Sequence, residues 1–157
     1  MELTGGNNWF EDFTVGDVLR HARGKTVTEM DNVLITNMVM NTADAHFNEH
    51  VMATSDLPFK QRVVFGGITV SMVIGLAAQD TAENAIAELG MDKIRLKVPV
   101  FHGDTLYAYS EVLEKRSSER PRAGVVRFRH WGVNQCDEVV FEGERSVLVR
   151  RRPEVRS

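Results

Sequence analysis

The chain has 157 residues, of which 43% are hydrophobic and 26% charged, and its formal net charge at pH 7 is −3. This length and composition fit one globular domain with a sizeable core, which we expect at residues 9–152 between mobile ends at 1–8 and 153–157. The acidic balance argues against a general nucleic-acid binder, and a lone Cys136 without an apolar leader segment favours a cytoplasmic protein.

The first third of the chain predicts one strand followed by helices. Residues 18–27 alternate loosely and predict a strand, and Thr28 with Asp31 three residues later resembles a capping box at a helix start. The residues that follow have helical spacing and predict a stripe that faces the core. The stripe consists of Met30, Val33, Leu34, Asn37 and Met38. This helix should end near residues 41–44, which places His46 in a loop or a first turn before a short helix at 49–54.

Residues 65–80 are apolar almost all the way round, so this helix must be buried. The run is shorter than the roughly 20 residues of a membrane span, and we therefore expect protein, with no membrane, to cover it. Gly66 and Gly67 expose backbone N–H groups at the positive end of the helix dipole, where we expect the chemistry. Residues 82–89 predict one or two further helical turns closed by Gly90.

Four runs of β-branched and aromatic residues follow, at 93–100, 104–117, 124–133 and 138–151. The link at residues 134–137 is too short for a parallel crossover and predicts an antiparallel hairpin. In the second run, Leu106 and Ala108 share one face with Ser110, while Tyr107 and Tyr109 lie on the other. The prediction is an α+β fold in which one antiparallel sheet wraps around the central helix.

Four motifs occur in order along nearly the whole chain: WFEDFTVGD at 9–17, NTADAHF at 41–47, VVFGGIT at 63–69 with Ser71, and PVFHGDTL at 99–106. Together they resemble the MaoC-like (R)-specific enoyl-CoA hydratases and dehydratases, and among these the mesaconyl-CoA hydratase-like members. The resemblance implies a single hotdog domain that reversibly hydrates a 2-enoyl-CoA to a 3-hydroxyacyl-CoA, with no cofactor. The acyl group could be short and branched or dicarboxylic, as in mesaconyl-CoA.

In that family an Asp and a His five residues later form the catalytic pair, and the backbone at the start of the central helix holds the thioester oxygen. Here the His is His46, but Asn41 stands at the Asp position, as it does in the mesaconyl-CoA hydratase-like branch. An amide cannot accept a proton near neutral pH, so the base must come from elsewhere. We therefore expect His46 to act as acid and base, Asn41 to orient the water or the imidazole, and the Gly66 and Gly67 amides to be oxyanion donors.

The resemblance also indicates residues that bind substrate. The counterpart of Ser71 lies near the acyl chain, although this hydroxyl could simply bond back to a helix carbonyl. Asp44 stands where the family usually has Pro, and it is a second candidate for the base. Phe65 adjoins the glycine pair, and Lys60 and Arg62 could meet the phosphates of coenzyme A, although a solvated face explains these cations equally well.

The sequence leaves three other functions open and also predicts an oligomeric state. Asp44 or Glu49 could activate water in a hotdog thioesterase, or Asn41 could mark a lost base in an inactive acyl-thioester-binding or assembly subunit. His46, Glu49 and His50 match an inverted zinc-protease pattern, but no long helix or further ligand accompanies them, so we expect no metal. Unpaired strand edges and the outer tyrosines favour a homodimer or a higher oligomer of dimers, in which the helix-start amides could come from the other subunit.

Overall fold

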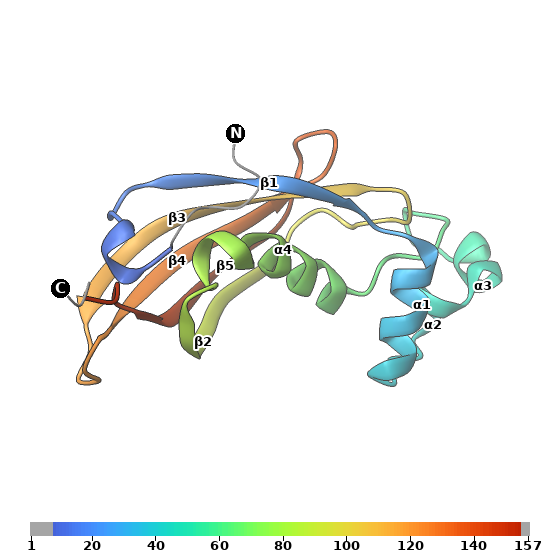
Figure 1. Cartoon of the computed structure of the whole chain (residues 1–157). Helices are drawn as coiled ribbons and strands as arrows, with labels where there is room; N and C mark the ends of the chain where they lie inside the picture. Colours follow the sequence, from blue (N-terminus) through green and yellow to red (C-terminus); the bar gives the residue numbers. More distant parts are fainter. Residues whose placement is uncertain (1–7, 155–157) are drawn as a thin grey trace.

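The computed structural model describes residues 8–154, in which one five-stranded antiparallel sheet curls around a long helix (Figure 1). The strands lie in the order β1-β3-β4-β5-β2 and comprise β1 (Val18–Thr26), β2 (Ala85–Leu96), β3 (Thr105–Ser117), β4 (Ala123–Val133) and β5 (Val139–Arg150). The central helix α4 (Gly66–Thr81) packs on the concave face, so the predicted α+β architecture is confirmed. A short 3₁₀ helix, Phe10–Asp12, precedes β1. The mobile ends remain a prediction, because residues 1–7 and 155–157 lie outside the described part of the chain.

The hairpin between β4 and β5 forms as predicted. Asn134 N donates to Glu138 O at 3.0 Å and Asp137 N donates to Asn134 O at 3.1 Å, which closes the turn. The two faces of β3 also divide as predicted: Leu106, Ala108, Ser110 and Val112 are buried, whereas Tyr107 and Tyr109 lie on the outer face. Tyr109 stacks on Trp131 of β4 with ring centroids 5.3 Å apart, so the chain itself covers part of this outer aromatic surface.

Helix α4 is buried against the sheet because its apolar residues occupy several sides. Ile68, Val73 and Ala77 are nearly inaccessible to solvent, and Ile68 and Val73 pack in one cluster with residues of β3 and β5. The helix approaches β4 so closely that a Cβ at Gly132 would collide with Val73. Among residues 8–154, no helix combines the length and apolar character that a membrane crossing requires.

The predicted extension of the central helix is wrong. Helix α4 ends at Thr81, and strand β2 already begins at Ala85 and contains Gly90, which does not adopt the positive φ of a left-handed cap. Strand β2 pairs with β5 from Ala85 opposite Val149 onward, and these backbone partners outweigh the helical propensity of the Ala- and Glu-rich segment. The strand predicted at 93–100 therefore starts earlier and ends at Leu96.

Three helices form a lobe beyond one end of the sheet (Figure 1): α1 (Glu29–Met38), α2 (Asp44–Phe47) and α3 (Glu49–Thr54). The predicted capping box is present, with Asp31 N donating to Thr28 Oγ1 at 3.2 Å and Thr28 N donating to Asp31 Oδ2 at 2.7 Å. The helix ends at Met38, a few residues before the predicted stop, and the predicted short helix at 49–54 is confirmed.

Both ends of this lobe are fixed to the connection between β2 and β3. Val27 N donates to Asp104 O and Gly103 N donates to Val27 O, both at 2.8 Å. At the other end, Val64 N donates to Val100 O, also at 2.8 Å. Val27 and Val64 are themselves buried. Residues 28–63 therefore form an insertion whose two ends are anchored to one short connection.

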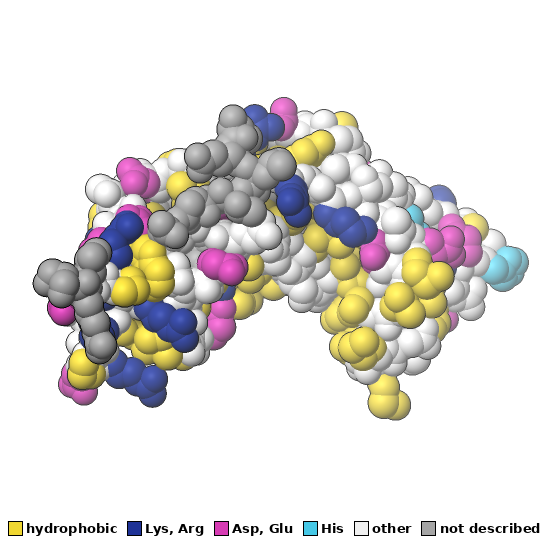
Figure 2. Space-filling model, viewed as in Figure 1, with side chains coloured by type: hydrophobic (Ala, Val, Ile, Leu, Met, Phe, Trp, Pro, Cys, Tyr) yellow, Lys and Arg dark blue, Asp and Glu magenta, His cyan; other side chains and the backbone are white. Residues whose placement is uncertain are grey.

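The apolar stripe of α1 does not face the core, which corrects the sequence-based prediction. The side chains of Met30, Leu34 and Met38 are exposed, Met38 at 76%, whereas Asn32 and Thr36 on the opposite side are 0% exposed. Figure 2 shows hydrophobic side chains gathered on the surface of this lobe. On the inner side of α1, Asn32 bonds to the backbone groups His46 O and Phe65 N, and buried backbone groups of this kind need polar partners.

A chain of hydrogen bonds runs through the interior between α4, β1, β3 and β4. Asp80 Oδ2 lies 2.6 Å from His21 Nδ1, and Ser110 Oγ lies 2.7 Å from both His21 Nε2 and His130 Nδ1. Burial, together with the charges of Arg145 and His21, lowers the pKa of His130 to about 3. Ser110 is fully buried, so substrate cannot reach this serine and the chain of bonds is structural.

Candidate active site

His46 lies in the four-residue helix α2, and its imidazole has a defined orientation. Its Nδ1 atom lies 2.7 Å from the carbonyl oxygen of Val63, which can only accept a hydrogen bond, so Nδ1 carries the hydrogen. In the neutral ring the Nε2 atom then keeps its lone pair. Val63 N donates to Ala45 O at 2.9 Å, which pairs the two backbone segments around the ring. The geometry leaves Nε2 available as a proton acceptor.

The start of α4 provides the second set of polar groups. The first amides of a helix have no intrahelical acceptor, and those of Gly66 and Gly67 have no hydrogen-bond acceptor within residues 8–154. A Cβ at Gly66 would collide with Leu96, and a Cβ at Gly67 would lie 2.5 Å from a ring carbon of Phe65. At Gly66 only the terminal methyl group of the exposed Leu96 side chain would have to move, whereas at Gly67 the ring of Phe65 would be displaced. The two glycines leave the amides unobstructed by side chains of their own.

His46 and Gly66 line the same pocket of about 220 Å³, with Thr69 of α4 and with residues of β2 and the following connection. The structure thus brings the predicted base and one predicted oxyanion donor together within a single chain. The ring of Phe65 lies next to the imidazole, with centroids 5.7 Å apart and planes inclined by 59°. A reacting group in this pocket would meet one titratable ring and the positive end of a helix.

Asn41 and Asp44 lie on the lobe but do not line this pocket. Asn41 Oδ1 accepts a hydrogen bond from Ala43 N at 3.3 Å, and Asn41 N donates to Thr36 O at 2.9 Å. The Asn41 amide thus shapes the turn that leads into α2. Asp44 is exposed at the first position of α2, where a carboxylate suits the positive end of a helix.

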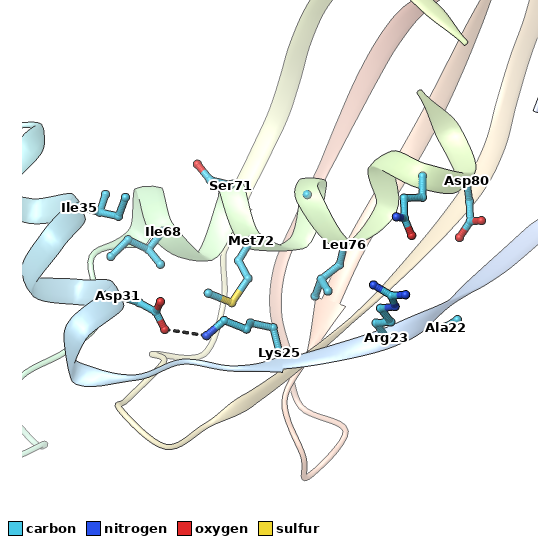
Figure 3. A pocket seen from close by; sticks show the side chains of 12 residues that line it. Ala22, Arg23, Lys25, Asp31, Ile35, Ile68, Ser71, Met72, Leu76 and Asp80 are labelled. Carbon is cyan, nitrogen blue, oxygen red and sulfur yellow. Dashed lines mark hydrogen bonds and ion pairs between the residues drawn. The ribbon is translucent and has the colours of Figure 1, made fainter. Parts of the chain in front are cut away.

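Ser71 lies on a different face of α4, in a larger pocket of about 510 Å³ between α4, β1 and α1. In Figure 3, Met72 and Leu76 extend from α4 toward β1, where Lys25 forms an ion pair with Asp31 at 2.8 Å. Neither His46 nor Gly66 lines this larger pocket. We take the smaller pocket as the candidate active site, because it contains the groups that can move a proton and hold an oxyanion.

The two cations considered for phosphate binding already have partners in the lobe. Arg62 donates to Glu49 Oε2 at 2.7 Å and to Glu29 Oε1 at 2.5 Å, and these hydrogen bonds hold the pKa of both carboxyls below the usual range. The two glutamates in turn raise the pKa of Arg62. Arg62 therefore ties α1 to α3, while the exposed Lys60 donates to the carbonyl of Ser55.

Asn32 contacts both parts of the site, and the sequence analysis did not single it out. Its Nδ2 atom donates to His46 O at 3.2 Å and its Oδ1 atom accepts from Phe65 N at 3.1 Å. Asn32 and Thr36 lie four residues apart on the side of α1 opposite the apolar stripe. This spacing could have indicated an inward polar face, had the stripe not been assigned to the core.

Comparisons with known proteins agree with this arrangement. The family model of mesaconyl-CoA hydratase matches residues 7–151. A β-methylmalyl-CoA dehydratase from Chloroflexus aurantiacus is 36% identical over 155 residues, which cover 95% of this chain and 42% of that protein. An (R)-specific enoyl-CoA hydratase from Rhodospirillum rubrum is 30% identical over 148 residues, 92% of this chain and 94% of that protein.

A solved structure shares the fold. The crystal structure of a putative MaoC domain protein dehydratase from Chloroflexus aurantiacus superposes with a TM-score of 0.86 at 30% identity, over 95% of this chain and 46% of that one. A conserved hypothetical protein from Mycobacterium tuberculosis, described as having a double hotdog fold, superposes with a TM-score of 0.75 at 19% identity, over 95% of this chain and 46% of that one, which confirms the predicted hotdog fold. The chain spans less than half the length of several curated relatives that it matches.

Proposed function

The chain belongs to the mesaconyl-CoA hydratase family, and on that basis we propose that it reversibly hydrates a 2-enoyl-CoA to a 3-hydroxyacyl-CoA. One observation carries the proposal: His46 donates through Nδ1 to Val63 O and keeps Nε2 as a base in the pocket that it shares with Gly66. The names of the relatives favour a short branched or dicarboxylic acyl group such as mesaconyl-CoA as substrate.

In the proposed reaction, His46 Nε2 takes a proton from water, and the water oxygen forms a bond to C3 of the enoyl group. The electron pair of the double bond moves toward the thioester, so negative charge develops on the thioester oxygen. The Gly66 and Gly67 amides are fixed donors for this charge, and removal of one such donor typically costs roughly 3 to 4 kcal/mol. His46 then returns its proton to C2, which completes the addition of water.

Asn41 has an orienting role in this proposal. An amide cannot take the proton, and Asn41 does not line the pocket, so in this proposal it orients the imidazole through the turn before α2. Its Oδ1 atom holds that turn by accepting a hydrogen bond from Ala43 N. Proton transfer then depends on His46 alone.

We also propose that two copies of the chain form the working unit. Strand β2 lies at one edge of the sheet and exposes large apolar side chains: Ile86, Leu89, Met91, Ile94 and Leu96. An unpaired edge of this kind invites pairing with another chain. Several relatives are more than twice as long as this chain, and a second copy could supply the equivalent of their remaining part.

We further propose a cytoplasmic location, because the free, exposed Cys136 of this chain suits a reducing compartment.

The test is a spectrophotometric assay of the purified protein with mesaconyl-CoA and with straight-chain 2-enoyl-CoA esters. Hydration removes the conjugated thioester absorbance without releasing a thiol. His46→Ala should abolish this loss of absorbance and keep the fold, whereas His50→Ala, a change of an exposed residue on α3, should leave turnover unchanged. Release of free thiol would instead identify a thioesterase, and binding without turnover would identify an inactive subunit.

A further inference from the structure

Asn32 is a fully buried amide between the two halves of the candidate site. Its side chain projects from the inner face of α1, and its surroundings exclude solvent completely. A buried amide costs free energy unless its polar atoms are paired, and a hydrophobic side chain would fill such a space at a lower cost. The presence of Asn here therefore indicates a need for its hydrogen bonds.

The two partners of Asn32 fix which way the amide points. Phe65 N is a donor, so it must face the oxygen of the amide; His46 O is an acceptor, so it must face the nitrogen. A carboxylate could accept from Phe65 N but would place a second acceptor against His46 O. An aliphatic side chain could pair with neither group. Among side chains of this size, only an amide satisfies both contacts.

These partners are backbone groups that adjoin the groups of the proposed chemistry. His46 holds the base, and Phe65 immediately precedes the glycine amides at the start of α4. The lobe meets α4 between these two residues, and the rigid side-chain amide of Asn32 connects them. Because Asn32 takes up Phe65 N, the next amides in the chain, those of Gly66 and Gly67, are the ones that remain for a ligand.

We propose that Asn32 is a positioning residue, which fixes the distance and angle between the base and the oxyanion donors by bonding to both backbone segments. This inference rests on the proposed hydratase function. Asn32 does not line the pocket of His46, so it acts through His46 and Phe65 and touches no substrate. Displacement of a reacting group by about 1 Å can reduce a rate on the order of 100-fold, which sets the expected effect.

The first test measures the imidazole itself and needs no substrate. In uniformly ¹⁵N-labelled protein, two-bond ¹H–¹⁵N correlations distinguish the Nδ1–H from the Nε2–H tautomer, and comparison with His46→Ala assigns the signal of His46. We expect the Nδ1–H tautomer in the wild type, because Val63 O accepts from Nδ1. We expect a mixture of both tautomers in Asn32→Leu and Asn32→Asp, because loss of the bond to His46 O lets the ring move away from Val63 O. An unchanged tautomer in both variants would overturn the proposal whether or not the protein is a hydratase.

The second test separates positioning from stability. Asn32→Leu and Asn32→Asp should lower kcat on the order of 100-fold and change KM by less than about threefold, because no contact to substrate is lost. Thr36→Val is the matched control: Thr36 is equally buried on the same helix, but its hydroxyl bonds only within α1, to Asn32 O and Val33 O. This control should lose stability and keep kcat.

A comparable loss of kcat in Thr36→Val at equal thermal stability would reduce Asn32 to a general structural role and overturn the inference. If the wild type lacks hydratase activity, the proposed function fails, but the tautomer measurement still decides the role of Asn32. If Asn32→Leu does not fold, Asn32→Asp retains the acceptor for Phe65 N and tests the bond to His46 O alone.

Discussion

The buried imidazole of His130 should make the stability of the protein depend on pH in a way that one substitution can remove. Its pKa is about 3 in the folded protein, against 6.5 as the ordinary value. Between these values the unfolded chain binds a proton that the folded chain does not, so the free energy of unfolding must fall as the pH falls from about 6.5 to about 3. Above pH 7 the imidazole is neutral in both states and this loss is absent.

The magnitude follows from the two pKa values. Between pH 7.5 and pH 5.0 the folded His130 stays neutral, while the unfolded residue goes from about one-tenth to nearly fully protonated. The corresponding loss in the free energy of unfolding is about 2 kcal/mol. The full loss approaches about 5 kcal/mol only below pH 3, where the folded residue is protonated as well.

The perturbation is His130→Asn, which removes the titration but leaves an amide that can donate to Ser110 Oγ in place of His130 Nδ1. Urea unfolding followed by far-UV circular dichroism, at one protein concentration and at both pH values, gives the two free energies. The variant should be less stable than the wild type at pH 7.5, because the smaller side chain leaves a cavity. Its loss on going to pH 5.0 should be about 2 kcal/mol smaller than that of the wild type.

The comparison between variant and wild type isolates His130, because the other titratable groups are present in both. His50→Asn is the control, since His50 is exposed on α3 and its replacement should leave the pH dependence unchanged. If His130→Asn and the wild type lose the same free energy between the two pH values, the imidazole is not held neutral by burial and the reasoning is refuted.

Three further predictions concern the site and the assembly. Gly67→Val should lower kcat more than it raises KM, because a branched side chain would collide with Phe65 and displace the oxyanion amides; steady-state kinetics with only KM raised would contradict this role. Asn41→Asp should keep or broaden hydratase activity, whereas an inert wild type activated by this change would mean that the base had been lost. Leu89→Lys on the edge of β2 should weaken dimerisation in light scattering, and a fully active 17.7 kDa wild-type monomer at micromolar concentration would exclude the dimer.

The sequence predicted those elements whose pattern is decided locally. Thr28 and Asp31 indicated the start of α1, and the alternation around Leu106 and Tyr107 assigned the two faces of β3, because caps and strand faces depend on neighbouring residues. Residues 85–90 were assigned to a helix incorrectly, because only the pairing of β2 with β5, more than fifty residues away, makes this segment a strand. No local pattern carries that information.

The sequence predicted the candidate site only in part. Motifs identified His46 and Gly66, and the structure brings the two residues to one pocket. Asn32 was missed because its two hydrogen-bond partners are backbone groups fourteen and thirty-three positions away, and because the apolar stripe of α1 was expected to face inward. Arg62 was considered for a ligand, but its partners Glu29 and Glu49 come together only when the lobe folds.

The anchoring of residues 28–63 at Val27 and Val64 gives the protein a modular construction. The sheet and α4 form a unit with its own core. The helical lobe that carries His46 is attached to this unit at two nearby points of the connection between β2 and β3. Segments of other lengths can be inserted between such fixed points at a small entropic cost, because the entropy lost on closing a loop grows only slowly with the length of the loop. A lobe that carries another side chain in place of His46, the proposed base, could therefore be exchanged for this one, while the sheet and α4 would still present the amides of the helix start.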